Sequence, residues 1–227
     1  IYSRTRESAE QLSERLRDVP YSTDISRVPT DGDLYIFAVK DSALLDLVSR
    51  MPSNRGLWVH TAGSMDMEVF APYTARYGVF YPMQTFSKER ETDFDDIPIF
   101  VETNHTDDTE RLQKLAGRLS TKVYEATSEQ RKYLHLAAVF ACNFSNHLYA
   151  LCDRILSEHG LPFETMLPLI RETAAKVADM PPAQAQTGPA IRYDKNVIDK
   201  QMALLSDPTM RQIYDLMSRS IHETNKH

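Results

Sequence analysis

The segment DLYIFAVK, residues 33–40, decides the fold of the first half of this chain, because six apolar residues stand in a row between Asp33 and Lys40. Such a continuous apolar run is typical of a β-strand that is buried on both faces of a parallel sheet. Asp41 and Ser42 follow directly and can cap a helix that extends to about Met51. A buried strand that leads straight into a helix predicts an α/β fold.

Strand and helix signals alternate on both sides of this unit. Residues 1–3 are predicted as the end of a strand and residues 8–19 as an amphipathic helix. Further elements are predicted as strands at residues 57–61, 77–83, 97–102 and 122–126, and as a helix at residues 107–120. This alternation predicts a parallel sheet with helices packed on its faces.

The second half of the chain is predicted to be entirely helical. Residues 128–159 contain neither glycine nor proline, which predicts one helix of about 30 residues, roughly 45 Å long. Gly160 and Pro162 end it. A second helix is predicted at residues 163–179 with a kink or break at Pro168, and one or two helices follow a loop that ends near residue 193. We therefore expect two domains, residues 1–126 and residues 127–227.

Composition excludes several classes of partner. The 227 residues are 42% hydrophobic and 26% charged, with a formal net charge of -6, which argues against a nucleic-acid or anionic-membrane surface. No apolar run approaches the roughly 20 residues needed to span a bilayer, so we expect a soluble, cytoplasmic protein. Cys142 and Cys152 lie ten residues apart on a predicted helix, too far apart for a disulfide. We expect buried thiols in a reducing compartment.

The first predicted strand ends in Ser3, Arg4, Thr5 and Arg6. In a dinucleotide-binding fold the second strand ends beside the adenosine ribose, where an acidic residue binds NAD and an arginine accommodates the 2'-phosphate of NADP. These residues therefore predict NADP as the cofactor, and the alternative is a helix start with solvated arginines. Other predicted strands end in further cofactor-contacting candidates, which are Val39, Lys40 and Thr61.

Candidate substrate-binding residues lie in two further kinds of segment. Ser64, Gln84 and Thr85 follow strands that are predicted to be buried, at the edge where open α/β sheets bind ligands. The alternative for Ser64 is a helix cap. The loop after residue 180 gathers amide, hydroxyl and guanidinium groups, and its alternative is a plain linker. Its candidates are Gln186, Thr187 and Arg192.

The long predicted helix carries a polar stripe on a mostly apolar surface. Asn146 lies within about 40° of His135 around the helix axis and Asn143 about 80° away. The stripe is either a hydrogen-bonded core network or the wall of an active-site cleft. Since histidine titrates near neutral pH, His135 and His60 are the candidate general acids, and Asn143 and Asn146 are the companion candidates in the catalytic site.

Other templates for chemistry are not matched. No G-x-S-x-G elbow, Walker loop or helical histidine pair at metal-binding spacing is present. We therefore expect no metal site.

Several stretches together resemble a family of Rossmann-like oxidoreductases with a helical C-terminal domain of unknown function, in the wider group of pyrroline-5-carboxylate reductase, 6-phosphogluconate dehydrogenase and deazaflavin-dependent NADP reductase. They are IYSRT, DLYIFAVKD, HTAGSM, YPMQTF, IPIFVE, HLAAVFACNFSNHLY, LIRETAAK and QTGPAIRYD. The resemblance implies an α/β Rossmann-type domain, here without its first strand and glycine-rich loop, and then an all-α domain. Members of the wider group often carry a catalytic lysine and asparagine on the long helix, whereas this chain offers His135, Asn143 and Asn146.

The function that we predict is hydride transfer between NADP(H) and a small carbonyl or imine compound. The alternatives are a non-catalytic dinucleotide-binding or sensory protein on the same fold, and a structural helical dimer. A homodimer is expected in any case, because apolar residues occur all around the helix at residues 128–159.

Overall fold

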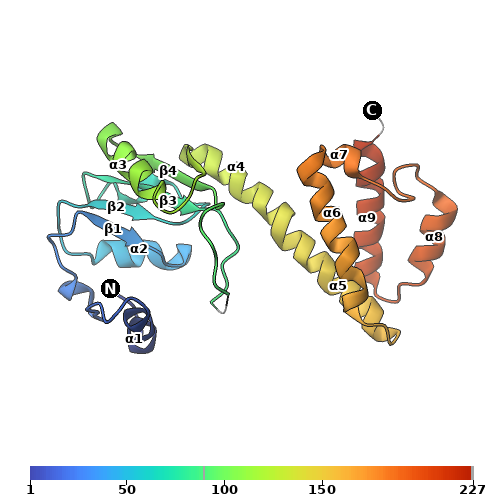
Figure 1. Cartoon of the computed structure of the whole chain (residues 1–227), viewed down its shortest axis with the longest axis horizontal. Coiled ribbons are helices and arrows are strands. Elements are labelled where there is room, and N and C mark those ends of the chain that lie inside the picture. Colours follow the sequence, from blue (N-terminus) through green and yellow to red (C-terminus); the bar gives the residue numbers. More distant parts are fainter. Residues whose placement is uncertain (89, 226–227) are drawn as a thin grey trace. The chain divides into compact units, whose positions relative to one another are not determined.

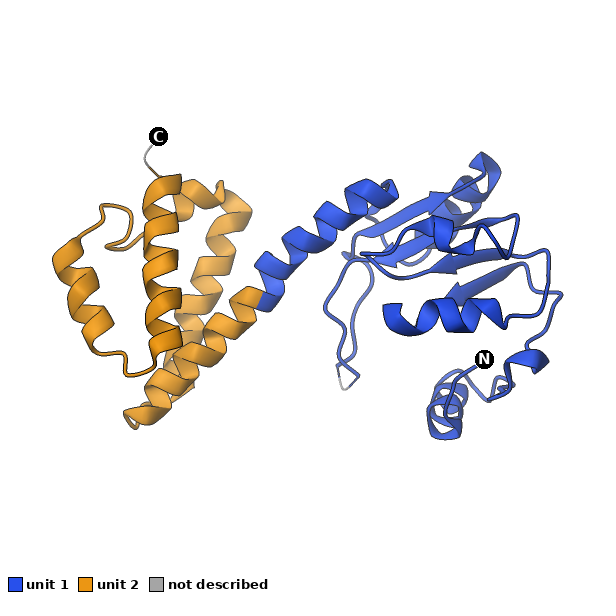
Figure 2. Cartoon of the chain, turned by 180° about the vertical axis from the view of Figure 1, so that it is seen from behind, with its two compact units in different colours: residues 1–143 blue, residues 144–227 orange. Residues whose placement is uncertain are grey.

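The computed structural model describes residues 1–88 and 90–225. These residues form two compact units, residues 1–143 and residues 144–227 (Figure 2). The predicted boundary at residues 126/127 coincides with the change from mixed to purely helical structure, whereas the two units divide further along, inside the long helix. Each unit is described by itself below.

The first unit is built on a five-stranded sheet with the strand order β1-β2-β3-β4-β5. The strands β1, β2 and β3 are parallel, β4 runs antiparallel to β3, and β5 is parallel to β4. Helices flank this sheet (Figure 1), so the predicted Rossmann-like α/β class is confirmed. The strands are β1 (Leu34–Phe37), β2 (Leu57–His60), β3 (Tyr77–Pro82), β4 (Ile99–Thr103) and β5 (Val123–Glu125).

The direction of β4 corrects the prediction of a fully parallel sheet. A parallel connection needs a crossover, usually a helix, and the described residues between β3 and β4 contain no helix. The close pairing of β4 with β3 also depends on Gly78, because a Cβ atom at this position would lie 2.1 Å from the backbone oxygen of Glu102. Only glycine allows this approach.

The N-terminal residues also differ from the prediction. Tyr2 forms an isolated parallel bridge with Ser22 and is not part of the five-stranded sheet. The helix α1 (Arg6–Arg15) begins and ends earlier than predicted. Arg17 and Asp18 follow it with φ values of 64° and 62°, a left-handed conformation that cannot continue the helix.

Helices cover both faces of the sheet. On one face, α2 (Asp41–Ser49) and the 3-10 helix η2 (Met67–Phe70) pack on Phe37, Trp58 and Tyr77. On the other face, α3 (Thr106–Ala116) packs on β2, β3 and β4 through Leu112 and Ala116. In a third cluster, Leu134 of the long helix is partly buried and packs against the sheet. The buried residues of this cluster are Val79, Tyr81, Phe100 and Ala126. Burial of each large apolar side chain contributes about 1.5–3 kcal/mol.

The long helix is continuous, as predicted, but its hydrogen-bond pattern changes in the middle. It consists of α4 (Ser128–Ala138), a π-helical turn η3 (Val139–Phe144) and α5 (Ser145–Glu158). Thr127 and Gln130 form a capping box that fixes its start. The π-helical turn was not predicted, and such turns occur frequently at functional sites.

The second unit contains α5 and the helices that follow it. Pro168 lies in the first turn of α6, so it begins a helix where a kink was predicted. Gly160 ends the long helix with a φ of 70°, as predicted. In the part of the chain that the structure describes, no helix is long and apolar enough to cross a membrane. The elements are η4 (Phe163–Met166), α6 (Leu167–Asp179), α7 (Pro182–Ala185), α8 (Lys195–Ala203) and α9 (Pro208–Thr224).

Candidate functional site

The parallel strands β1, β2 and β3 end at one edge of the sheet, which we call the carboxyl edge. The segment after β2, residues 61–66, and the end of β3 lie there, and α4 packs close by through Leu134. Open α/β sheets bind their ligands at this edge. The candidate site is therefore built from these three segments of the first unit.

His60 is the last residue of β2 and is only 1% exposed. Its Nδ1 accepts the N–H of Ala62 at 3.2 Å, and its Nε2 lies 3.3 Å from the carbonyl oxygen of Asp66, to which it can donate. Burial and, to a smaller extent, the nearby Arg131 cation together lower the pKa of His60 to about 4. A neutral histidine with both nitrogens engaged shapes the loop after β2 and is a poor proton donor at neutral pH. His60 is therefore suited to shaping this loop and not to the predicted role of general acid.

His135 lies on α4 and is exposed. Its Nδ1 lies 3.4 Å from the hydroxyl oxygen of Tyr81, and the two rings meet edge to face with centroids 6.5 Å apart. Gly63 lies against the same two groups, because a Cβ atom there would be 2.8 Å from Nδ1 of His135 and 2.8 Å from the Tyr81 hydroxyl. The structure thus brings His135 to the segment that follows β2.

Arg131, one turn before His135, is fully buried and anchors α4 to the sheet. It forms an ion pair with Glu102 of β4 and donates to the carbonyl oxygen of Met65 at 2.6 Å. Glu102 also accepts the backbone N–H and the hydroxyl of Ser128, at 2.9 and 2.8 Å. One buried ion pair therefore holds together β4, the start of α4 and the loop after β2, and it positions His135.

Tyr81 was not singled out in the sequence. Burial raises the pKa of its hydroxyl, the Arg131 cation opposes this rise, and Cys142 adds to it. Cys142 lies in the π-helical turn and is exposed, which corrects the prediction of a buried thiol; Cys152 is half-buried. The sequence feature that could have identified Tyr81 as a site residue is its position at the end of a buried strand, just before the predicted contacts Gln84 and Thr85.

Among the remaining candidates of the first unit, Ser64 and Gln84 form hydrogen bonds with other residues of this unit. The Ser64 hydroxyl donates to Asp41 at 2.5 Å and ties the loop after β2 to the start of α2. Gln84 accepts the backbone N–H of Thr85 at 2.8 Å, and both residues are exposed. Asn143 is an exposed residue of the π-helical turn.

Four candidates belong to the second unit, and their part in the site stays a prediction. The Gln186 side chain donates to the carbonyl oxygen of Thr187 at 3.1 Å. Asn146 on α5 and Arg192 after α7 are exposed.

The predicted cofactor contacts near the N-terminus are exposed, apart from half-buried Ser3. Arg6 is paired with Glu10 at 2.7 Å, and the Thr5 hydroxyl donates to Ser8 at 2.9 Å. Arg4 is exposed and lies two residues before α1. The Arg6 guanidinium is thus engaged within α1, and the part of both arginines in cofactor binding stays a prediction.

The candidates Val39, Lys40 and Thr61 lie at the carboxyl edge. Lys40 is the residue before α2, and the backbone N–H of Thr61 donates to the carbonyl oxygen of Phe37 at 3.3 Å. A guanidinium, an ammonium and several hydroxyl groups suit the ribose-phosphate end of NADP. No G-x-G loop occurs in the 227 residues, so no residue here is assigned to a pyrophosphate.

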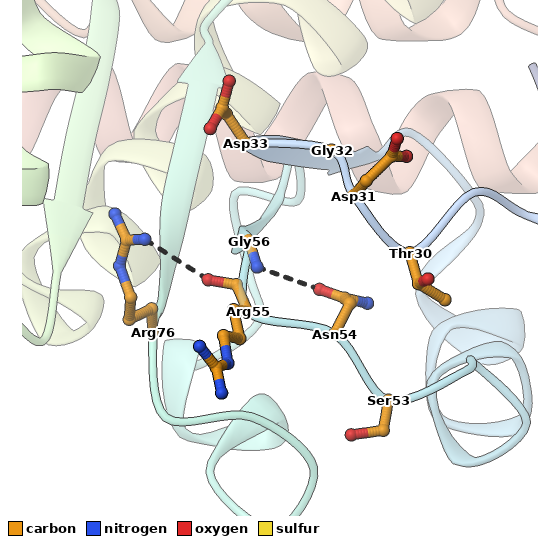
Figure 3. Close-up of a pocket in the computed structure, with 9 residues that line it drawn as sticks. All are labelled: Thr30, Asp31, Gly32, Asp33, Ser53, Asn54, Arg55, Gly56 and Arg76. Atoms are coloured by element: carbon orange, nitrogen blue, oxygen red, sulfur yellow. Dashed lines mark hydrogen bonds between the residues drawn. The ribbon is translucent and has the colours of Figure 1, made fainter.

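A cavity of about 540 Å³ lies at the opposite, amino edge of the sheet (Figure 3). Its polar groups mainly brace the loops before β2 and β3. Asn54 accepts N–H groups of Gly56 and Trp58 at 3.1 and 2.9 Å, and Arg76 donates to the carbonyl oxygen of Arg55 at 3.3 Å and pairs with Asp108. No candidate residue lines this cavity, so we do not place the site there.

The fold and the carboxyl-edge site place the chain among Rossmann-like proteins with a helical C-terminal region. Residues 97–221 match the model of a domain of unknown function, DUF2520. The chain belongs to this family, which confirms the resemblance. No curated protein matches the chain.

Solved structures extend the comparison. The chain is 52% identical to a "putative NADP oxidoreductase" from Bacteroides fragilis, over 98% of this chain and 87% of that one, with a TM-score of 0.89. A reductive aminase from Aspergillus terreus, in complex with NADPH and ethyl levulinate, is 16% identical over 98% and 84% of the two chains, with a TM-score of 0.71. An imine reductase from Myxococcus stipitatus, in complex with NADP+, is 16% identical over 99% and 85%, with a TM-score of 0.69. The last two share the fold.

Proposed function

We propose that this protein is an NADP-dependent oxidoreductase that transfers a hydride between NADP(H) and a small carbonyl or imine compound, with His135 exchanging the proton. The observation that carries the proposal is the position of His135. An exposed histidine contacts Tyr81 at the carboxyl edge, where this fold binds dinucleotides. The description of the 52% identical Bacteroides fragilis protein supports the cofactor class and the reaction class.

The substrate class rests on the chemistry of the site and on the two reductases that share the fold. NADPH supplies the hydride when it is bound. Reduction of a C=O or C=N group leaves the heteroatom in need of a proton. His135 is the group here that can provide it, because its Nδ1 is engaged by Tyr81 and its Nε2 remains to reach a substrate.

The roles of the other candidates follow from where they lie. Arg4 would pair with the 2'-phosphate, and Ser3, Thr5, Lys40 and Thr61 would make other contacts to the cofactor. Ser64, Gln84, Thr85 and Asn143 would face the substrate from the first unit. The candidates Asn146, Gln186, Thr187 and Arg192 of the second unit stay predictions from the sequence.

We also propose that the helical unit pairs with a second copy of the chain. Its buried apolar residues are Ala190, Ile198 and Met210, whereas larger side chains on its helices are strongly exposed. A small helical unit that leaves so many large apolar side chains exposed gains stability when it buries them, and symmetric pairing is a common way to do so. The exposed side chains include Leu169 at 63%, Val177 at 50%, Leu204 at 79% and Leu216 at 63%.

Two measurements on the purified protein test the proposed function. Calorimetric titration with NADPH and with NADH should show tighter binding of NADPH. NADPH absorbance should then fall when a cyclic imine or a small ketone is added. No NADPH binding would contradict the proposal. Binding without turnover on any member of such a panel would favour the alternative, a non-catalytic dinucleotide-binding or sensory protein.

A further inference from the structure

Three separate segments of the first unit meet at the Tyr81 hydroxyl. Tyr81 comes from β3, His135 from α4 and Gly63 from the loop after β2. The hydroxyl oxygen lies 3.4 Å from Nδ1 of His135, and Gly63 leaves room for both groups because it has no Cβ atom. The contact between Tyr81 and His135 therefore restrains the orientation of the exposed His135 ring.

We propose that Tyr81 is a positioning residue that holds the proton of His135 on Nδ1 and thereby makes Nε2 the nitrogen that exchanges a proton with the substrate. This inference rests on the proposed function, because a proton-exchanging Nε2 requires a substrate that is reduced. A tyrosine hydroxyl can both donate and accept a hydrogen bond, and the hydrogen bond at one nitrogen of a histidine determines the role of the other.

In the proposed step the Tyr81 oxygen accepts a hydrogen bond from Nδ1–H both before and after the proton transfer. In the charged ring, Nδ1–H donates to the Tyr81 oxygen and Nε2–H points to the substrate. The Nε2 proton passes to the carbonyl oxygen or imine nitrogen as the substrate carbon receives the hydride, and the electron pair of the broken N–H bond stays on Nε2. The ring is then neutral, with its remaining proton still on Nδ1 and still bonded to Tyr81.

Burial keeps the tyrosine in the form that this role needs. Because burial raises the pKa of Tyr81, the side chain stays a neutral phenol at physiological pH. The ion pair of Arg131 with Glu102 and the hydrogen bond of Arg131 to Met65 hold the first turns of α4 on the sheet, which keeps the backbone of His135 near Tyr81. The 3.4 Å separation is at the long end for a hydrogen bond and is expected to shorten when a substrate is bound.

The test is nitrogen NMR of the histidine rings in the ligand-free protein, with the His135 signal assigned by its loss in His135→Gln. At a pH where the ring is neutral, the wild type should show a protonated Nδ1 and an unprotonated Nε2. Tyr81→Phe, which keeps the ring and removes only the hydroxyl, should give a mixture of the two tautomers. Gly63→Ala, which keeps the hydroxyl but pushes the two rings apart, should give the same mixture.

Kinetics supply the second readout. Tyr81→Phe should lower kcat about 10-fold with little change in KM or in the NADPH Kd, since it removes one neutral hydrogen bond that acts on the reacting histidine. An unchanged tautomer population in Tyr81→Phe would overturn the inference, and so would a wild-type ring that carries its proton on Nε2. The NMR experiment needs neither cofactor nor substrate. Failure of the proposed function, seen as absent NADPH binding, is therefore distinguishable from failure of this inference.

Discussion

Replacement of His60 by glutamine should remove a pH dependence from the stability of the first unit. The pKa of His60 is about 4 in the folded protein and about 6.5 in an unfolded chain. Between these values the unfolded chain binds a proton that the folded protein does not bind, so acid favours unfolding. The contribution of His60 is fully present above pH 6.5 and is lost as the pH falls towards 4.

The magnitude follows from the size of the shift. One pKa unit corresponds to about 1.4 kcal/mol, so the full loss is about 3 kcal/mol, of which about 2 kcal/mol falls between pH 7 and pH 5. Trp58 is the only tryptophan of the chain. It packs on Phe70, which also contacts His60, with ring centroids 6.0 and 5.6 Å apart. Urea unfolding followed by tryptophan fluorescence therefore reports on the surroundings of His60.

Glutamine can keep the contacts to Ala62 and Asp66 but cannot take up a proton, so His60→Gln should lose far less stability between pH 7 and pH 5 than the wild type. The matched control is His159→Gln, at an exposed helix end, which should keep the wild-type difference. An equal loss of stability in wild type and His60→Gln would refute the assignment of His60 as a buried neutral histidine.

Three further predictions concern the ion pair, the cofactor and the assembly. Glu102→Gln leaves Arg131 buried without a counter-charge. This change should lower the free energy of unfolding of the first unit, measured in urea, by about 3–5 kcal/mol. A loss below about 1 kcal/mol would mean that the ion pair does not anchor α4. Arg4→Asp should weaken NADPH binding roughly 10-fold or more in calorimetry and leave NADH binding nearly unchanged, whereas an equal loss for both cofactors would remove Arg4 from the phosphate site. Light scattering should give the mass of a dimer at micromolar concentration, and a monomer at high micromolar concentration would contradict pairing of the helical unit.

Much of the fold could be predicted because its signals are local. Apolar runs such as residues 33–40 coincide with strands, and the absence of glycine and proline from residues 128–159 marks the long helix. The direction of β4 was not predicted, although the absence of a predicted helix between residues 83 and 97 is the signal for an antiparallel return. The π-helical turn could not be predicted, because nothing in residues 139–144 distinguishes it from an ordinary α-helix.

The candidate site was predictable only in part, because residue type does not reveal burial. His60 and His135 were equivalent as candidates in the sequence, yet one is 1% exposed with both nitrogens engaged and the other is exposed. Tyr81 acquires its role from a histidine 54 positions away. A pairing at that separation depends on how α4 packs on the sheet, and no local pattern encodes it.

The proton-exchanging role of His135 is tested most directly by His135→Gln, measured for NADPH binding and for NADPH oxidation with an imine or ketone that the wild type reduces. Glutamine keeps hydrogen-bonding capacity but cannot exchange a proton, and general acid catalysis by a positioned side chain is worth about 100-fold or more. We expect His135→Gln to bind NADPH with an unchanged Kd and to turn over at a rate reduced by at least that factor, whereas His159→Gln should keep the wild-type Kd and the wild-type turnover. Turnover within about 2-fold of the wild type in a folded, NADPH-binding His135→Gln protein would contradict this role of His135.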